Sequence, residues 1–139
     1  MGDLNAFLIF NGNCAEAMRF YERTLGGKLE ALMTHAQSPE ADQTPPGQAD
    51  KIIYSRLAID RGVLMGMDAP ASKPYEGMKG FLLSLAYPTA GEAKRVFDAL
   101  AKGGKVTMPL QKTFYAETFG MLADRFGTPW MISGAMTTA

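Results

Sequence analysis

The sequence contains very few residues of the kinds that make disulfides, histidine metal sites or membrane spans. Its 139 residues include one cysteine, Cys14, and one histidine, His35. A single cysteine forms no intramolecular disulfide, and the N-terminus has no basic segment followed by an apolar stretch and a cleavage site, so we expect a cytoplasmic protein. No uncharged apolar run approaches the roughly 20 residues that cross a bilayer. We therefore expect no membrane partner.

An excess of charge of one sign is also missing. Lys and Arg number 14, as do Asp and Glu, and the basic residues form no block of the kind that follows a phosphate backbone, so we expect no nucleic-acid partner. Hydrophobic residues make up 47% of the chain and charged residues 20%, which is enough apolar surface to bury a core. The ten methionines fit a core or a deformable apolar pocket. A chain of this length fits a single domain.

The first half of the chain predicts a strand, a helix and three further strands. An apolar stripe at helical spacing begins at Ala15 and ends at Gly26-Gly27, a pair that favours a helix C-terminus. The segment 36–50 contains three prolines, two aspartates and three glutamines without an apolar period, so we expect a long exposed loop. The strands are expected at Leu4–Phe10, Lys28–His35, Lys51–Ile59 and Val63–Met67.

The second half of the chain repeats the first. The helical sequence Glu16-Ala17-x-Arg19-x-Tyr21-Glu22 recurs as Glu92-Ala93-x-Arg95-x-Phe97-Asp98, and both copies are followed by Gly-Gly-Lys. The repeat predicts an α+β fold of two tandem βαβββ modules, residues 1–69 and 79–139, with a linker at 70–78. The alternative is two unrelated amphipathic helices with ordinary C-terminal glycines. The strands of the second module are expected at Gly80–Ala86, Lys105–Leu110, Thr113–Asp124 and Pro129–Ser133.

Two blocks of sequence carry a family resemblance. The first is Phe10-Asn11-Gly12-Asn13-Cys14-Ala15-Glu16-Ala17 with Phe20-Tyr21 and Thr24-Leu25-Gly26-Gly27, and the second is Phe114-Tyr115-Ala116, Phe119-Gly120, Asp124-Arg125-Phe126-Gly127 and Pro129-Trp130. With the paired modules, they resemble the PhnB-like branch of the vicinal oxygen chelate superfamily of glyoxalases, bleomycin-resistance proteins and extradiol dioxygenases. The resemblance implies a cupped mixed sheet with the helices outside, and a homodimer formed by pairing or exchanging modules.

Glyoxalase-type members of this superfamily hold a divalent ion with four His or Glu side chains from the first and last strand of each module. The corresponding positions here fall near Ala6, Met65, Phe81 and Met131, and their neighbours include no His or Glu. Because such ions need oxygen or nitrogen donors, we expect no metal and no other cofactor. The sequence Asn11-Gly12-Asn13 also lacks the glycine-rich loop of a typical S-adenosylmethionine site.

A different polar pair is implied by the resemblance. PhnB-like relatives often carry one histidine on the third strand and another on the seventh, where this sequence has Tyr54 and Glu117. The two residues would form a hydrogen-bonding or acid–base pair in the cavity, with the phenol donating to the carboxylate or to a ligand oxygen. The alternative is that Tyr54 is an ordinary strand aromatic and Glu117 a surface residue near a turn.

The remaining polar candidates are expected to be structural. His35 ends a strand beside the long loop, where a lone histidine is usually solvated. Cys14 begins a helix, whose dipole would lower a thiol pKa, but no histidine is placed to activate it, so we expect a buried small residue. Asp68 is expected to cap the Ala69-Pro70 turn, and Asp124-Arg125 to shape the last hairpin.

Three functions fit these features. The sequence favours a protein that binds a small apolar or aromatic molecule in a dimer cavity, since methionine and aromatic side chains form a deformable apolar wall. The alternatives are a metal-dependent lyase, isomerase or dioxygenase of glyoxalase type, and a dimeric interaction protein without catalysis. The pocket is expected to be lined by Tyr54, Met65, Met67, Phe81, Phe114, Tyr115, Glu117 and Trp130.

Overall fold

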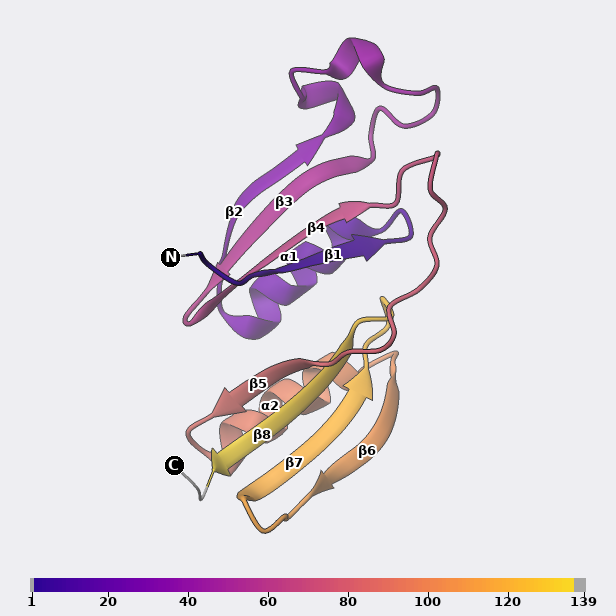
Figure 1. Cartoon of the computed structure of the whole chain (residues 1–139). Helices are drawn as coiled ribbons and strands as arrows, with labels where there is room; N and C mark the ends of the chain where they lie inside the picture. Colours follow the sequence, from indigo (N-terminus) through magenta and orange to yellow (C-terminus); the bar gives the residue numbers. More distant parts are fainter. Residues whose placement is uncertain (1, 137–139) are drawn as a thin grey trace. The chain divides into compact units, whose positions relative to one another are not determined.

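The computed structural model describes residues 2–136 and divides into two compact units, with the boundary between Gly77 and Met78. This boundary falls inside the predicted linker. Among the described residues, each unit contains one α-helix and one four-stranded sheet (Figure 1). Both α-helices are 12 residues long, and no described helix is long and apolar enough to span a membrane.

In the first unit, a mixed sheet packs against one helix. β1 (Ala6–Phe10) pairs parallel with β4 (Gly62–Asp68), which pairs antiparallel with β3 (Ile52–Ile59), and β3 pairs antiparallel with β2 (Lys28–Thr34). Figure 1 shows α1 (Cys14–Leu25) lying along one face of this sheet. Because side chains alternate along a strand, each strand presents every second residue to the helix and the others to the opposite face.

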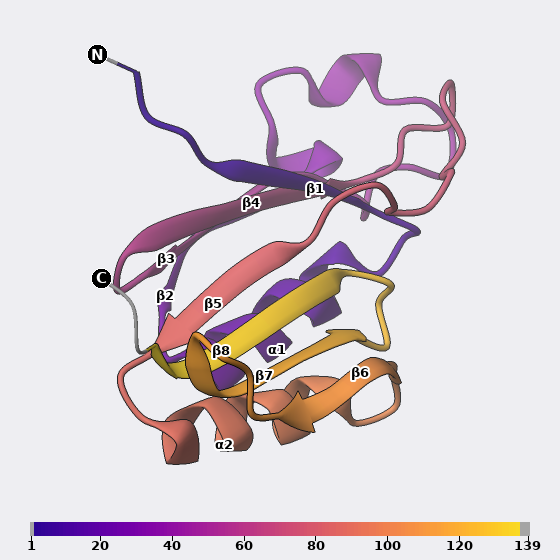
Figure 2. The same cartoon turned by 60° about the horizontal axis from the view of Figure 1, so that its bottom comes forward.

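The second unit repeats this arrangement. β5 (Leu83–Tyr87) pairs parallel with β8 (Pro129–Met136), which pairs antiparallel with β7 (Ala116–Ala123), and β7 pairs antiparallel with β6 (Lys105–Gln111). Figure 2 shows α2 (Ala90–Ala101) along one face of its sheet. The predicted fold of two βαβββ modules is confirmed.

Each unit has a core between its helix and its sheet. Each helix turns one face toward its sheet, and the side chains on that face are buried. In the first unit the core includes Leu8, Phe10, Ala17, Met18, Tyr21 and Leu57. In the second it includes Ala93, Val96, Phe97, Leu100, Leu122, Trp130 and Ile132.

The glycine pairs that follow the helices are required by packing. Gly26 has a φ of 77° and its backbone N–H donates to the carbonyl oxygen of Glu22, which ends α1 in the left-handed conformation that glycine favours. A Cβ on Gly27 would overlap the carbonyl oxygen of Ala58, and a Cβ on Gly104 would overlap that of Ala123. The repeated glycine therefore lets the chain leave each helix directly beside the neighbouring strand.

Two strands of the second unit begin later than predicted. The strand expected from Gly80 begins at Leu83, because Gly80 has a φ of 84° and turns the chain. The strand expected from Thr113 begins at Ala116, because the Thr113 N–H donates to the Ala116 carbonyl oxygen and closes a turn. Phe81, Phe114 and Tyr115 therefore precede strands instead of lying in them.

The segment 36–50 is an exposed loop, as predicted, but it has local structure. It holds most of one 3-10 helix, η1 (His35–Gln37), and all of a second, η2 (Ala41–Gln43), and none of its side chains is buried. Thr34 starts η1, since its hydroxyl accepts from the Gln37 N–H while the Gln37 side chain accepts from the Thr34 N–H. Composition alone did not reveal this reciprocal cap.

Candidate functional site

The face of the first sheet that points away from α1 carries a mainly apolar group of side chains, and we call it the open face. The strand register sets Phe7 opposite Met65, and Met65 opposite Arg56. These three residues, Phe7, Met65 and Arg56, form one row across the sheet. Two residues away along each strand, the same face carries a second row, which consists of Ile9, Met67 and Tyr54. Phe7 is 43% exposed and Ile9 38%, so β1 contributes apolar surface as well as core.

A hollow of about 470 Å³ lies at the end of the open face. Its sheet side is formed by Ile9 and Met67, and its other side by Pro70 and the segment 73–77. A volume of this size suits a small organic molecule, for which pockets typically measure roughly 300–1,000 Å³. The hollow therefore lies between the open face and the segment 70–77, which ends the first unit.

Polar groups also meet on the open face. The Tyr54 hydroxyl and Arg56 Nη1 both donate toward the sulfur of Met65, each at 3.9 Å. Arg56 Nε donates to Glu30 Oε1 at 3.0 Å. Hydrogen bonding to Glu30, and then to Tyr54, raises the pKa of Arg56, so the guanidinium remains charged. The open face thus combines an apolar floor with the Arg56–Glu30 ion pair and one phenol.

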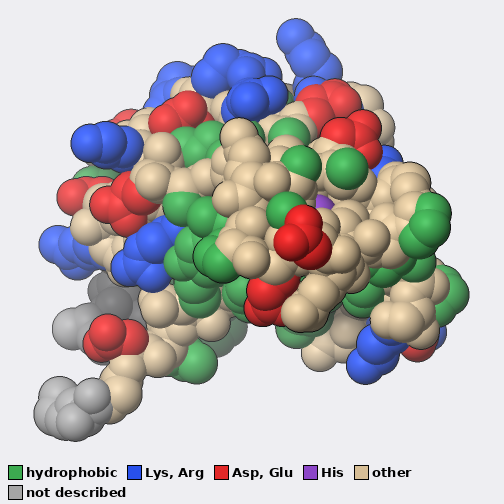
Figure 3. Space-filling view, turned by 90° about the horizontal axis from the view of Figure 1, so that it is seen from above, with side chains coloured by type: hydrophobic (Ala, Val, Ile, Leu, Met, Phe, Trp, Pro, Cys, Tyr) green, Lys and Arg blue, Asp and Glu red, His purple; other side chains and the backbone are tan. Residues whose placement is uncertain are grey.

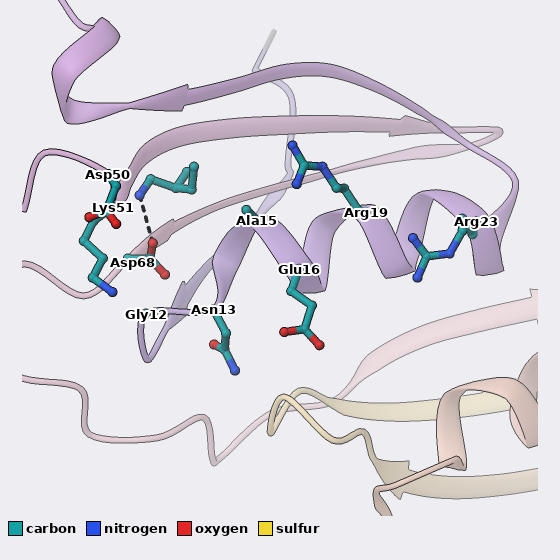
Figure 4. A pocket seen from close by; sticks show the side chains of 10 residues that line it. Gly12, Asn13, Ala15, Glu16, Arg19, Arg23, Asp50, Lys51 and Asp68 are labelled. Atoms are coloured by element: carbon teal, nitrogen blue, oxygen red, sulfur yellow. Dashed lines mark hydrogen bonds between the residues drawn. The ribbon is translucent and has the colours of Figure 1, made fainter.

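A second hollow of the first unit, about 430 Å³, lies at the start of α1 (Figure 4). Its lining includes Arg19, Arg23 and Lys51 but also acidic residues, so its charges are mixed. Both signs of charge are also interspersed over the face drawn in Figure 3, with hydrophobic side chains between them. We therefore assign no charged ligand to this hollow. The acidic residues in its lining are Glu16, Asp50 and Asp68.

Asp68 in this second hollow has a structural role. Its Oδ1 accepts from the Cys14 N–H at 2.9 Å, and its Oδ2 accepts from the Ile52 N–H at 2.8 Å. The expected cap of the Ala69-Pro70 turn is wrong, because the Ala69 N–H donates to the carbonyl oxygen of Phe10. The carboxylate instead ties the end of β4 to the starts of α1 and β3.

The sequence placed three residues of the first unit in the pocket, and the structure brings them together. Tyr54, Met65 and Met67 share the open face, and Met67 also lines the hollow. Sequence reasoning missed Phe7, Ile9 and Arg56. The alternation of side chains along β1 and β3 could have found all three, since Arg56 follows Tyr54 by two residues, but the position of Arg56 beside Met65 became apparent only from the register of β3 with β4.

The aromatic candidates of the second unit lie before its strands. Phe81 precedes β5 and is 44% exposed. Phe114 and Tyr115 precede β7, with ring centroids 4.9 Å apart, and Tyr115 makes a further edge contact of 5.6 Å with Phe119. These rings form a small aromatic cluster at one end of the second sheet.

Glu117 and Trp130 differ in their surroundings. Glu117 is exposed on β7. Trp130 is 1% exposed in the core of the second unit, and its indole N–H donates to Asp124 Oδ2 at 2.9 Å. Asp124 also accepts from the N–H groups of Phe126 and Thr128, and so shapes the last hairpin. Tyr54 and Glu117 belong to different units, so their pairing stays a prediction.

The residues at the superfamily's metal positions do not fit a divalent ion. In the first unit Phe7, not Ala6, stands opposite Met65. In the second, Ser84 stands opposite Met131, while Phe81 lies before the strand. A thioether is a soft ligand that suits Zn, Mn or Fe(II) poorly, and one hydroxyl does not replace histidine and glutamate. Between residues 2 and 136, no three or more His, Cys, Asp or Glu side chains are grouped as metal ligands.

Cys14 is a buried core residue, as the sequence favoured. Its sulfur lies 3.6 Å from the hydroxyl of Ser55. Burial raises the pKa of the Cys14 thiol to about 12, against the lowering effect of the Ser55 hydrogen bond and with a further increase from the charge of Asp68. The thiol is therefore protonated at neutral pH and is a poor nucleophile.

Comparison with known proteins shows similarity along nearly the whole chain. Residues 3–132 match the Glyoxalase/Bleomycin resistance protein/Dioxygenase superfamily. Protein YjdN of Escherichia coli (strain K12) is 37% identical over 139 residues, which cover 94% of this chain and 93% of that protein. Protein PA1353 from Pseudomonas aeruginosa is 46% identical, with a TM-score of 0.90 and coverage of 96% and 98%. The PhnB protein from Bacillus cereus shares the fold, with a TM-score of 0.81, 24% identity and coverage of 96% and 100%.

Proposed function

Since the chain belongs to the Glyoxalase/Bleomycin resistance protein/Dioxygenase superfamily, we propose that it binds a small apolar or aromatic molecule against the open face of its first sheet. The observation that carries the proposal is the 470 Å³ hollow at the end of that face. Ile9 and Met67 give the hollow an apolar sheet side, and Met65 and Phe7 continue the apolar surface beside it.

The composition of this surface supports a deformable site. Met65 and Met67 have unbranched side chains that adapt to different ligand shapes, and their sulfurs make favourable contacts with aromatic rings. Covering such a surface removes apolar area from water, which is worth about 0.8 kcal/mol for each buried CH₂ group. No metal enters the proposal, because the paired residues at the superfamily's usual positions are poor ligands.

A homodimer is part of the proposal. Phe7 and Ile9 are both more than a third exposed, and a second copy of the chain would cover this apolar surface and enclose the ligand in a cavity of the dimer. Sedimentation or light scattering at micromolar concentration should return twice the 15.0 kDa mass of the chain. A mass of one chain under these conditions contradicts the dimer.

Native mass spectrometry of protein purified from its own host tests the ligand proposal. We expect a co-purified small molecule with the unaltered protein and its loss from the variant Met67→Glu, which places a charge in the hollow. The matched control is Leu4→Glu, because Leu4 is fully exposed and outside the hollow. Retention of the same molecule by Met67→Glu would place the binding site elsewhere.

A further inference from the structure

Two hydrogen-bond donors on the open face converge on an acceptor that is too weak to satisfy them. The Tyr54 hydroxyl and Arg56 Nη1 are both directed at Met65 Sδ, at 3.9 Å each. A thioether sulfur is a weak acceptor, whereas a carboxylate oxygen binds a guanidinium at about 2.7–2.9 Å through charge-assisted hydrogen bonds. A carboxylate would therefore be a much better partner than the sulfur for both donors.

Glu30 orients the guanidinium without occupying all of it. The contact of 3.0 Å uses Nε, on the side edge of the group. A guanidinium carries five N–H donors in a planar fork, so the end-on edge formed by the two Nη atoms can still bind a carboxylate in a bidentate manner. The side chains of Arg56 and Glu30 are 38% and 44% exposed, so a ligand can approach this edge.

The apolar surface continues directly from these donors. Met65 is opposite Arg56, and Met67 follows two residues along β4 and lines the hollow. Strand geometry places Arg56 and Met67 roughly 8 Å apart, from about 4.8 Å between strands and 6.8 Å along one. A molecule with an anionic end at Arg56 would extend its apolar body over Met65 toward the hollow.

From this geometry we infer that the ligand of the open face is an organic carboxylate with an apolar body of about this length, bound by Arg56 and Tyr54 at its anionic end. This inference rests on the proposed function and names the chemical class of its ligand. A monoanion is favoured over a dianionic phosphate ester, because Glu30 lies on the same guanidinium and repels a second negative charge.

The test compares acids with their neutral amides in calorimetric titrations. The probes are phenylalkanoates with one to four methylene groups and straight-chain acids of six to ten carbons, each beside its primary amide. For at least one pair, we expect the acid to bind about tenfold more tightly than the amide.

Arg56→Met, which keeps much of the apolar stem, should abolish this preference, and Tyr54→Phe should reduce it about threefold. Arg61→Met is the matched control, because Arg61 is exposed in the turn between β3 and β4.

The outcomes separate the two claims. If the amides bind as tightly as the acids, or if Arg56→Met leaves the acid preference unchanged while the protein remains folded by circular dichroism, the carboxylate inference is wrong and the binding function stands. If neither acids nor amides bind at millimolar concentration, the inference fails, and the co-purification result decides the broader function. Loss of the preference in Arg56→Met but not in Arg61→Met supports the inference.

Discussion

At the scale of single residues, Asp68 joins three elements through one buried carboxylate. It is 3% exposed and accepts hydrogen bonds from the backbone N–H groups of Cys14 and Ile52. Asp68→Ala would leave both donors buried without this partner, and hydrogen bonds to a charged group are the strong ones. We expect the free energy of unfolding in urea to fall by about 3 kcal/mol. The exposed Asp42 is the control, since Asp42→Ala should change stability by less than about 0.5 kcal/mol.

Cys14 gives a second prediction at this scale. Because burial raises the pKa of its thiol to about 12, the reactive thiolate is scarce at pH 8. Iodoacetamide at pH 8 should therefore label the native protein far more slowly than protein unfolded in urea, as followed by intact mass. Equal labelling rates in the two states would mean that the thiol is accessible in the fold and that a role in chemistry has to be reconsidered.

At the scale of elements, the glycines after the two helices should be equally intolerant of substitution. Gly27→Ala and Gly104→Ala each place a Cβ against a backbone carbonyl oxygen that cannot move independently of its strand. We expect each to lower the melting temperature by several degrees, as an overpacking cost of about 1–3 kcal/mol implies. Gly91→Ala in α2 is the matched control, because a Cβ at this position would meet no other part of the fold within 4 Å and alanine favours helix.

The elements also show how far sequence reasoning reaches. The helices, their glycine ends and the order of strands were predictable, because amphipathic periodicity and turn residues are local signals. The internal repeat supplied these signals in both halves of the chain. The starts of β5 and β7 were not, since they depend on the left-handed turn at Gly80 and the hydrogen-bonded turn at Thr113. The place of Arg56 beside Met65 was missed for a related reason. It is set by pairing between strands, which no single segment encodes.

At the scale of the whole molecule, the absence of a tightly bound divalent metal at the superfamily position remains a prediction. Met65 and Met131 would have to act as ligands there, and thioethers bind Zn, Ni, Mn and Fe(II) poorly. Elemental analysis of purified protein should find well below one equivalent of these metals per chain. About one equivalent per chain, lost on Glu117→Ala, would contradict this and favour the metal-dependent enzyme.

The central claim is that the open face of the first sheet binds the ligand. The most direct measurement is NMR of protein labelled at the methionine methyl groups, titrated with 4-phenylbutyrate and with 4-phenylbutyramide. Signals are assigned by single Met→Leu variants. The methyl groups of Met65 and Met67 should shift on titration with at least one probe, while that of Met18, a buried residue of α1, should not. Shifts confined to Met108 and Met121 of the second unit, with Met65 and Met67 unchanged, would contradict the account.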